Sequence, residues 1–65
     1  MSKLSDLDEM PFGKHKGTVM ANVPDEYLLW FWGENCDEYR GGKIEARTMK
    51  FDVMQYIDES FEDLP

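Results

Sequence analysis

The main helix of this protein is encoded in one short stretch of sequence, Asn22-Val23-Pro24-Asp25-Glu26-Tyr27-Leu28-Leu29-Trp30-Phe31-Trp32-Gly33. Pro24 suits the first helical position, and the two acids that follow it are favoured in the first turn by the helix dipole. Glycine weakens a helix, so Gly33 is the expected end. The stretch therefore predicts a helix from about Pro24 to Trp32, and residues 34–40 add one more short turn before the next glycine pair.

The predicted helix is apolar around almost its whole circumference. Such a helix is normally buried, but a chain of 65 residues has little protein with which to cover it. We interpret Tyr27 and Trp30 as core anchors, whereas Leu29 and Trp32 lie on the far side and are the candidate partner-binding residues. We therefore expect part of this helix to face a protein partner, with a homodimer as the alternative.

The C-terminal segment predicts a longer, amphipathic helix. At 100° per residue, one side collects the apolar residues Ala46, Met49, Val53, Met54, Tyr56, Ile57, Phe61 and Leu64. Ile44 and Phe51 do not fit this stripe, so either the helix begins after Lys43 or these two residues contact something else. A short strand over residues 44–48 is the competing interpretation. We expect the stripe to pack on the first helix and on the region of Phe12.

A turn rich in lysine and histidine lies near the N-terminus, between Gly13 and Gly17. Glycine permits the positive φ that such turns need. The tip either contacts an anion or is simply a solvated turn. Together with basic residues further along, six residues are candidates for contact with an anion or a nucleic acid: Lys14, His15, Lys16, Arg40, Lys43 and Arg47.

These elements predict an α+β fold. We interpret residues 10–18 as a tight β-hairpin or a looped segment, and the polar residues 1–8 as a flexible tail. Residues 9–65 then form a single small domain, in which the N-terminal β-hairpin or looped segment packs on two main helices.

The charge balance limits the function classes. The chain has 14 Asp and Glu against 7 Lys and Arg, a net charge of -7, which disfavours binding to a phosphate backbone. No apolar run approaches the roughly 20 residues of a membrane span. Residues 1–9 lack an apolar signal core, so we expect a cytoplasmic protein that does not bind membranes. One Cys and one His offer no nucleophile–base pair and too few metal ligands, so we expect no enzyme, no cofactor and no metal.

A family resemblance is carried by two runs of residues, Met10-Pro11-Phe12-Gly13-Lys14-His15-Lys16-Gly17 and Val23-Pro24-Asp25-Glu26-Tyr27-Leu28-Leu29-Trp30. They resemble the small bacterial and phage family labelled putative quorum-sensing-regulated virulence factor. They are also similar to the C-terminal domain of exonucleases of the exodeoxyribonuclease X type. The resemblance covers roughly residues 9–32. It implies a small accessory domain, often attached to nucleic-acid enzymes, that lacks the metal-binding acids of the nuclease itself.

Two functions follow as hypotheses. The apolar helix, the small size and the acidity favour a non-catalytic acidic interaction module, of phage or mobile-element origin, that binds and modulates a host or partner protein. The resemblance to exonucleases favours instead a nucleic-acid-binding accessory domain that contacts phosphates through the Lys14-His15-Lys16 tip. The acidic face of the last helix is either a solvated surface or a mimic of nucleic-acid phosphates.

Overall fold

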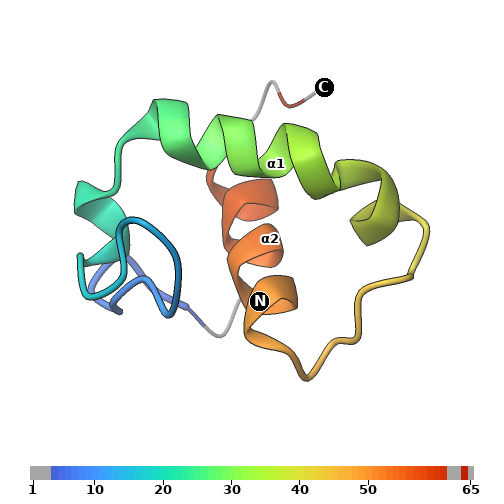
Figure 1. Ribbon diagram of the computed structural model, residues 1–65, viewed down its shortest axis with the longest axis horizontal. Coiled ribbons are helices and arrows are strands. Elements are labelled where there is room, and N and C mark those ends of the chain that lie inside the picture. Colours follow the sequence, from blue (N-terminus) through green and yellow to red (C-terminus); the bar gives the residue numbers. More distant parts are fainter. Residues whose placement is uncertain (1–3, 62–63, 65) are drawn as a thin grey trace.

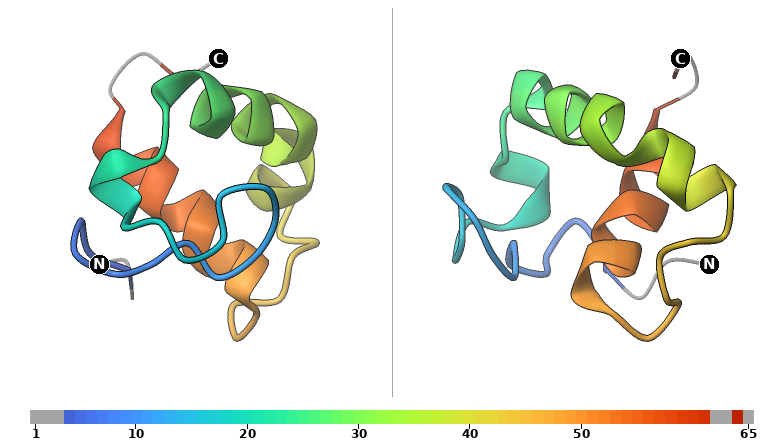
Figure 2. Two further views of the ribbon diagram at one scale, coloured as in Figure 1. Left: turned by 60° about the vertical axis from the view of Figure 1, so that its left-hand side comes forward. Right: turned by 45° about the vertical axis from the view of Figure 1, so that its right-hand side comes forward.

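Two helices carry the fold. α1 spans Asp25–Arg40, α2 spans Met49–Ser60, and a short 3-10 helix, η1, spans Met20–Asn22. The computed structural model describes residues 4–61 and residue 64. Figure 1 shows α1 lying across α2, with the blue segment that precedes η1 near one end of α1 and the yellow connection between the helices at the other end. The two further views in Figure 2 show the same crossing of the helices.

The predicted α+β class is wrong, because the residues that the structure describes form no strand. An isolated antiparallel bridge joins Glu9 to Val19, and the Met10 N–H donates to the Thr18 carbonyl at 2.8 Å. Between Met10 and Thr18 the backbone hydrogen bonds form successive turns, and η1 begins directly after Val19. No ladder therefore extends the bridge into a β-hairpin, and the protein is a small all-helical domain.

α1 is longer than the sequence predicted. The expected end at Gly33 is wrong, because the helix continues to Arg40. A glycine inside a helix costs about 1 kcal/mol relative to alanine. Packing of the second half of the helix offsets this cost, since the Tyr39 ring contacts the buried Trp32 ring with centroids 5.6 Å apart.

The end of α1 lies at the glycine pair, where the sequence predicted only the end of a separate short turn. The Lys43 N–H donates to the Glu38 carbonyl at 2.9 Å, and the Gly42 N–H donates to the Tyr39 carbonyl at 3.2 Å. Gly42 has a φ of 74°, which glycine adopts without steric strain. This pair of hydrogen bonds is the Schellman arrangement, which satisfies the last carbonyls of a helix.

The start of α2 is fixed by a threonine cap. The Thr48 side chain accepts a hydrogen bond from the Phe51 N–H at 3.2 Å, and the helix begins at the next residue after the threonine. The competing strand over residues 44–48 is wrong, because these residues form bends and turns. Ile44 joins the core from the connection, and the Phe51 ring lies 5.3 Å from that of Tyr39. These two contacts explain why Ile44 and Phe51 do not fit the stripe of α2.

Most of the predicted stripe is confirmed, since the buried residues of α2 are Val53, Met54, Tyr56 and Ile57. Phe61 and Leu64 are partly buried against the same core. Two members were misplaced, because Met49 is 61% exposed and Ala46 is exposed. The physical reason is the helix start: Ala46 precedes α2, and Met49 lies in its first turn.

The segment that precedes the loop is hydrogen-bonded to the rest of the chain. The Ala21 N–H donates to the Asp6 carbonyl at 3.1 Å, and the Tyr56 hydroxyl donates to Asp6 Oδ1 at 2.6 Å. Burial, and then this hydrogen bond, raise the pKa of Tyr56 from its ordinary 10.0 to about 12. That residues 1–8 form a flexible tail stays a prediction, and residues 1–3 lie outside the described part of the chain.

Candidate binding pocket

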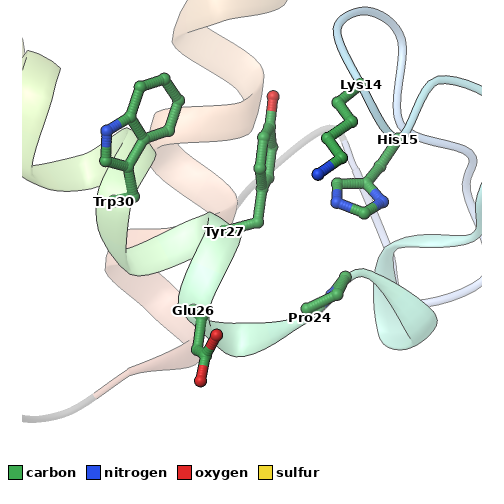
Figure 3. A pocket seen from close by; sticks show the side chains of 6 residues that line it. All are labelled: Lys14, His15, Pro24, Glu26, Tyr27 and Trp30. Atoms are coloured by element: carbon green, nitrogen blue, oxygen red, sulfur yellow. The ribbon is translucent and has the colours of Figure 1, made fainter.

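An open pocket of about 360 Å³ lies where the start of α1 meets the N-terminal loop. Six residues line it (Figure 3): Lys14, His15, Pro24, Glu26, Tyr27 and Trp30. Two of them belong to the loop between Gly13 and Gly17, and the other four belong to the first turns of α1 and the residue that precedes it. The fold therefore joins in one site the glycine-flanked turn and the aromatic helix, which are separate features of the sequence.

Tyr27 stands at the centre of the pocket. Its ring meets the His15 ring edge-on, with centroids 4.6 Å apart, and its centroid lies 5.7 Å from that of Trp30. Tyr27 and Trp30 are three residues apart, a spacing that places side chains on one face of a helix. In Figure 3 the Tyr27 ring lies between Trp30 on one side and Lys14 and His15 on the other. The result is an aromatic surface with a cationic edge.

The loop packs on α1 where the backbone of Gly13 lies close to the Tyr27 side chain. A Cβ at Gly13 would lie 2.7 Å from the Tyr27 hydroxyl oxygen, and Gly13 has a φ of 82°. Only glycine combines this conformation with so close a neighbour. Gly17 also has a positive φ, of 88°, but it has open space around it. The expected positive φ is confirmed at both glycines, and Gly13 in addition makes room for the pocket's central ring.

The two lysines of the tip differ from other basic residues in their surroundings. Two other bases have carboxylate partners: Arg47 Nε lies 2.9 Å from a Glu45 carboxylate oxygen, and Lys50 Nζ lies 3.7 Å from a Glu38 carboxylate oxygen. In the part of the chain that the structure describes, Lys14 and Lys16 have no carboxylate partner. The chain has twice as many acidic residues as basic ones. Two neighbouring lysines without carboxylate partners are therefore a local excess of positive charge that the composition does not predict.

The six candidate anion-contact residues do not form one surface. The loop beside the start of α1 contains Lys14, His15 and Lys16. The last turn of α1 and the connection after it contain Arg40, Lys43 and Arg47. α1 has 16 residues and is therefore about 24 Å long. The Arg40 guanidinium is engaged over the Trp32 ring, 5.3 Å from its centroid. A continuous cationic track along the protein is absent from the described residues.

The exposure of the two tryptophans is the reverse of the prediction. Trp32 is 0% exposed and belongs to the core, so its expected outward placement is wrong. Trp30, which was expected in the core, is 58% exposed. Leu29 is 45% exposed, so its outward placement is confirmed. That Leu29 contacts a partner stays a prediction, whereas Trp32 has no exposed surface with which to contact one.

The sequence contained a signal that Trp32, and not Trp30, is the buried tryptophan. Over the full length of α1, the buried or half-buried apolar side chains recur at helical spacing: Leu28, Phe31, Trp32, Cys36 and Tyr39. Trp30 is off this stripe. The stripe becomes visible only when the helix is continued past Gly33, so ending the helix there concealed it.

The pocket offers contact surfaces and hydrogen-bonding groups. Among the residues that the structure describes, no group of three or more His, Cys, Asp or Glu side chains gathers closely enough to hold a metal ion. None of the helices in that part of the chain has the length and apolar character needed to cross a membrane. Two aromatic faces, an ammonium, an imidazole and a carboxylate are the groups that the site presents.

Fold and site together define a small helical protein whose distinctive surface is an open aromatic pocket with a cationic edge. Residues 2–59 match the family described as "Putative quorum-sensing-regulated virulence factor", and the chain belongs to that family. The match extends well beyond residues 9–32, on which the resemblance in the sequence rested.

Two curated relatives share part of the chain. "Uncharacterized protein YpeB" of Escherichia coli strain K12, and the protein of the same name in Escherichia coli O157:H7, are each 51% identical over 35 residues. This region is 54% of the present chain and 46% of each relative, so the chain spans about half the length of the curated relatives it matches. No solved structure gave a significant match. The similarity to exonuclease domains is not shown by these comparisons and stays a prediction.

Proposed function

We propose that this protein is a non-catalytic binding module that contacts a partner protein through the pocket that Tyr27 and Trp30 line. The observation that carries this proposal is the exposure of Trp30, which is 58% exposed beside the half-buried Tyr27 ring. Tryptophan and tyrosine are enriched among the residues that dominate binding energy in protein interfaces. A cytoplasmic location and an origin in a phage or mobile element stay predictions.

Leu29 extends the exposed apolar surface beside the pocket. It neighbours Trp30 in the chain, and both side chains are exposed on α1. Their apolar atoms gain free energy when a partner removes them from water, at about 25 cal/mol per Å². The unpaired Lys14 at the opposite edge supplies the polar rim that such interfaces have.

Nucleic-acid binding is the second candidate function. An exposed aromatic ring beside lysines is a surface on which a single-stranded base can stack. Three observations favour a protein partner instead: the net charge of -7, the Glu26 carboxylate in the pocket, and the separation of the cationic residues to the two ends of α1. A polyanion needs several phosphate contacts in one track, and the described residues do not offer one.

Replacing Trp30 with alanine is expected to abolish capture of the partner. Tagged wild-type protein, the Trp30→Ala variant and the Leu7→Ala variant are used to capture material from bacterial lysate, with and without nuclease. Leu7 is 84% exposed and does not line the pocket, so its variant controls for a general loss of apolar surface. A defined protein should survive nuclease treatment, be lost with Trp30→Ala and be retained with Leu7→Ala. Equal capture by both variants, or capture that nuclease abolishes, contradicts the proposal.

A further inference from the structure

We propose that the pocket accepts a short peptide segment of the partner in which an acidic side chain lies next to an aromatic or large aliphatic one. This inference rests on the proposed function and names the chemistry of the partner. The apolar side chain lies on the rings of Trp30 and Tyr27, and the carboxylate pairs with Lys14.

The size of the pocket matches a short peptide segment rather than a folded surface. Its volume of about 360 Å³ is at the lower end of the roughly 300–1,000 Å³ of small-ligand sites. The Tyr27 ring contacts the His15 ring edge-on, and the Gly13 backbone lies close to its hydroxyl, so the ring presents a preformed wall. Preformed contact surfaces bind with less loss of conformational entropy.

Charge complementarity selects an acidic segment. Lys14 lines the pocket and has no carboxylate partner among the described residues, so its ammonium is available for an incoming carboxylate. His15 lies beside it and adds an N–H donor. The net charge of -7 opposes an acidic ligand at long range, but at physiological salt such repulsion is screened beyond about 8 Å. Contact with Lys14 is then the dominant electrostatic interaction.

Glu26 limits how much negative charge the site tolerates. Its carboxylate lines the same pocket as Lys14, so an extended polyanion that follows the pocket would meet a like charge. A peptide instead brings backbone N–H groups, which can donate to that carboxylate. A site that contains one ammonium and one carboxylate therefore fits a peptide with a single carboxylate better than a chain of phosphates.

The inference is tested by selecting random short peptides displayed on phage against the wild-type protein. The consensus peptide is then synthesised with both ends blocked, and its binding is titrated through the fluorescence of the exposed Trp30. We expect the selected peptides to share an acid next to an aromatic or large aliphatic residue. Trp30→Ala should weaken binding by at least about tenfold, measured by calorimetry because this variant lacks the fluorescent reporter.

The matched pair Lys14→Glu and Lys16→Glu separates a specific contact from general charge. Both variants change the net charge equally and both residues are exposed in the same loop, but only Lys14 lines the pocket. Lys14→Glu should weaken binding of the consensus peptide about tenfold or more, and Lys16→Glu about twofold or less. Equal effects of the two variants overturn the inference.

The remaining outcomes distinguish the inference from the function on which it rests. Selected peptides that lack acids, or a blocked single-stranded oligonucleotide that binds more tightly than the consensus peptide, overturn the inference. If no peptide is selected while Trp30-dependent capture of a protein persists, the inference fails and the proposed function stands. If Trp30-dependent capture is also absent, both fail.

Discussion

Replacing Ile57 with aspartate is expected to unfold this protein. Ile57 is 0% exposed in α2, and an unpaired carboxylate at that position would be buried among apolar side chains. Substitutions of this kind cost more than about 4 kcal/mol. At about 0.05–0.15 kcal/mol per residue, a chain of 65 residues has only about 3–10 kcal/mol of stability to lose. Far-UV circular dichroism at rising temperature should show no cooperative transition.

Met49→Asp is the matched control for this prediction. Met49 belongs to the same helix and to the stripe that the sequence predicted as buried, but it is 61% exposed in the first turn of α2. An acid is favoured in the first turn of a helix, so the change in the free energy of unfolding should be within about 0.5 kcal/mol. A cooperative melt of Ile57→Asp at the wild-type temperature, or unfolding caused by Met49→Asp, contradicts the packing of α2.

Trp32→Ala is expected to have the second largest effect, a loss of about 3–5 kcal/mol in the free energy of unfolding. The Trp32 side chain is fully buried, contacts the Tyr39 ring and lies beneath the Arg40 guanidinium. Its removal leaves a cavity and releases both neighbours. Chemical denaturation measures the loss, provided that the variant still folds in the absence of denaturant.

Trp30→Ala is the matched control, because it removes a tryptophan side chain from the opposite side of α1. Trp30 is 58% exposed, so its removal should change the free energy of unfolding by less than about 1 kcal/mol. The two variants together measure which tryptophan supports the fold and which is available for binding. A similar loss for both, or a larger loss for Trp30→Ala, is inconsistent with the structure.

Local sequence rules predicted several features of the fold. The two glycines of the loop have the positive φ that their flanking positions suggested. Helical structure stops at the glycine pair, as expected, and α1 begins directly after Pro24, one residue later than expected. Most of the apolar stripe of α2 is buried. These features depend on backbone conformation and on helical periodicity, which are encoded by neighbouring residues.

Features that depend on tertiary packing were not predicted. Gly33 is a poor helix former, and only the contact of Tyr39 with Trp32 shows why the helix continues through it. The pairing of Glu9 with Val19 gives a hairpin-like pattern, but the chain enters η1 before a second pair can form. For the site, the sequence identified Lys14 and His15 as candidates, and their placement beside Tyr27 required the fold.

The placement of the two tryptophans decides whether the pocket can bind a partner through an exposed ring, and collisional quenching of fluorescence measures this placement directly. The Trp32→Phe variant leaves Trp30 as the only tryptophan, and Trp30→Phe leaves Trp32. With acrylamide as quencher, the Trp32→Phe protein should emit at longer wavelength and be quenched strongly, because Trp30 is exposed to water. The Trp30→Phe protein should emit at shorter wavelength and be quenched weakly. The reverse pattern, or equal quenching of the two folded variants, would contradict a binding pocket that presents the Trp30 ring.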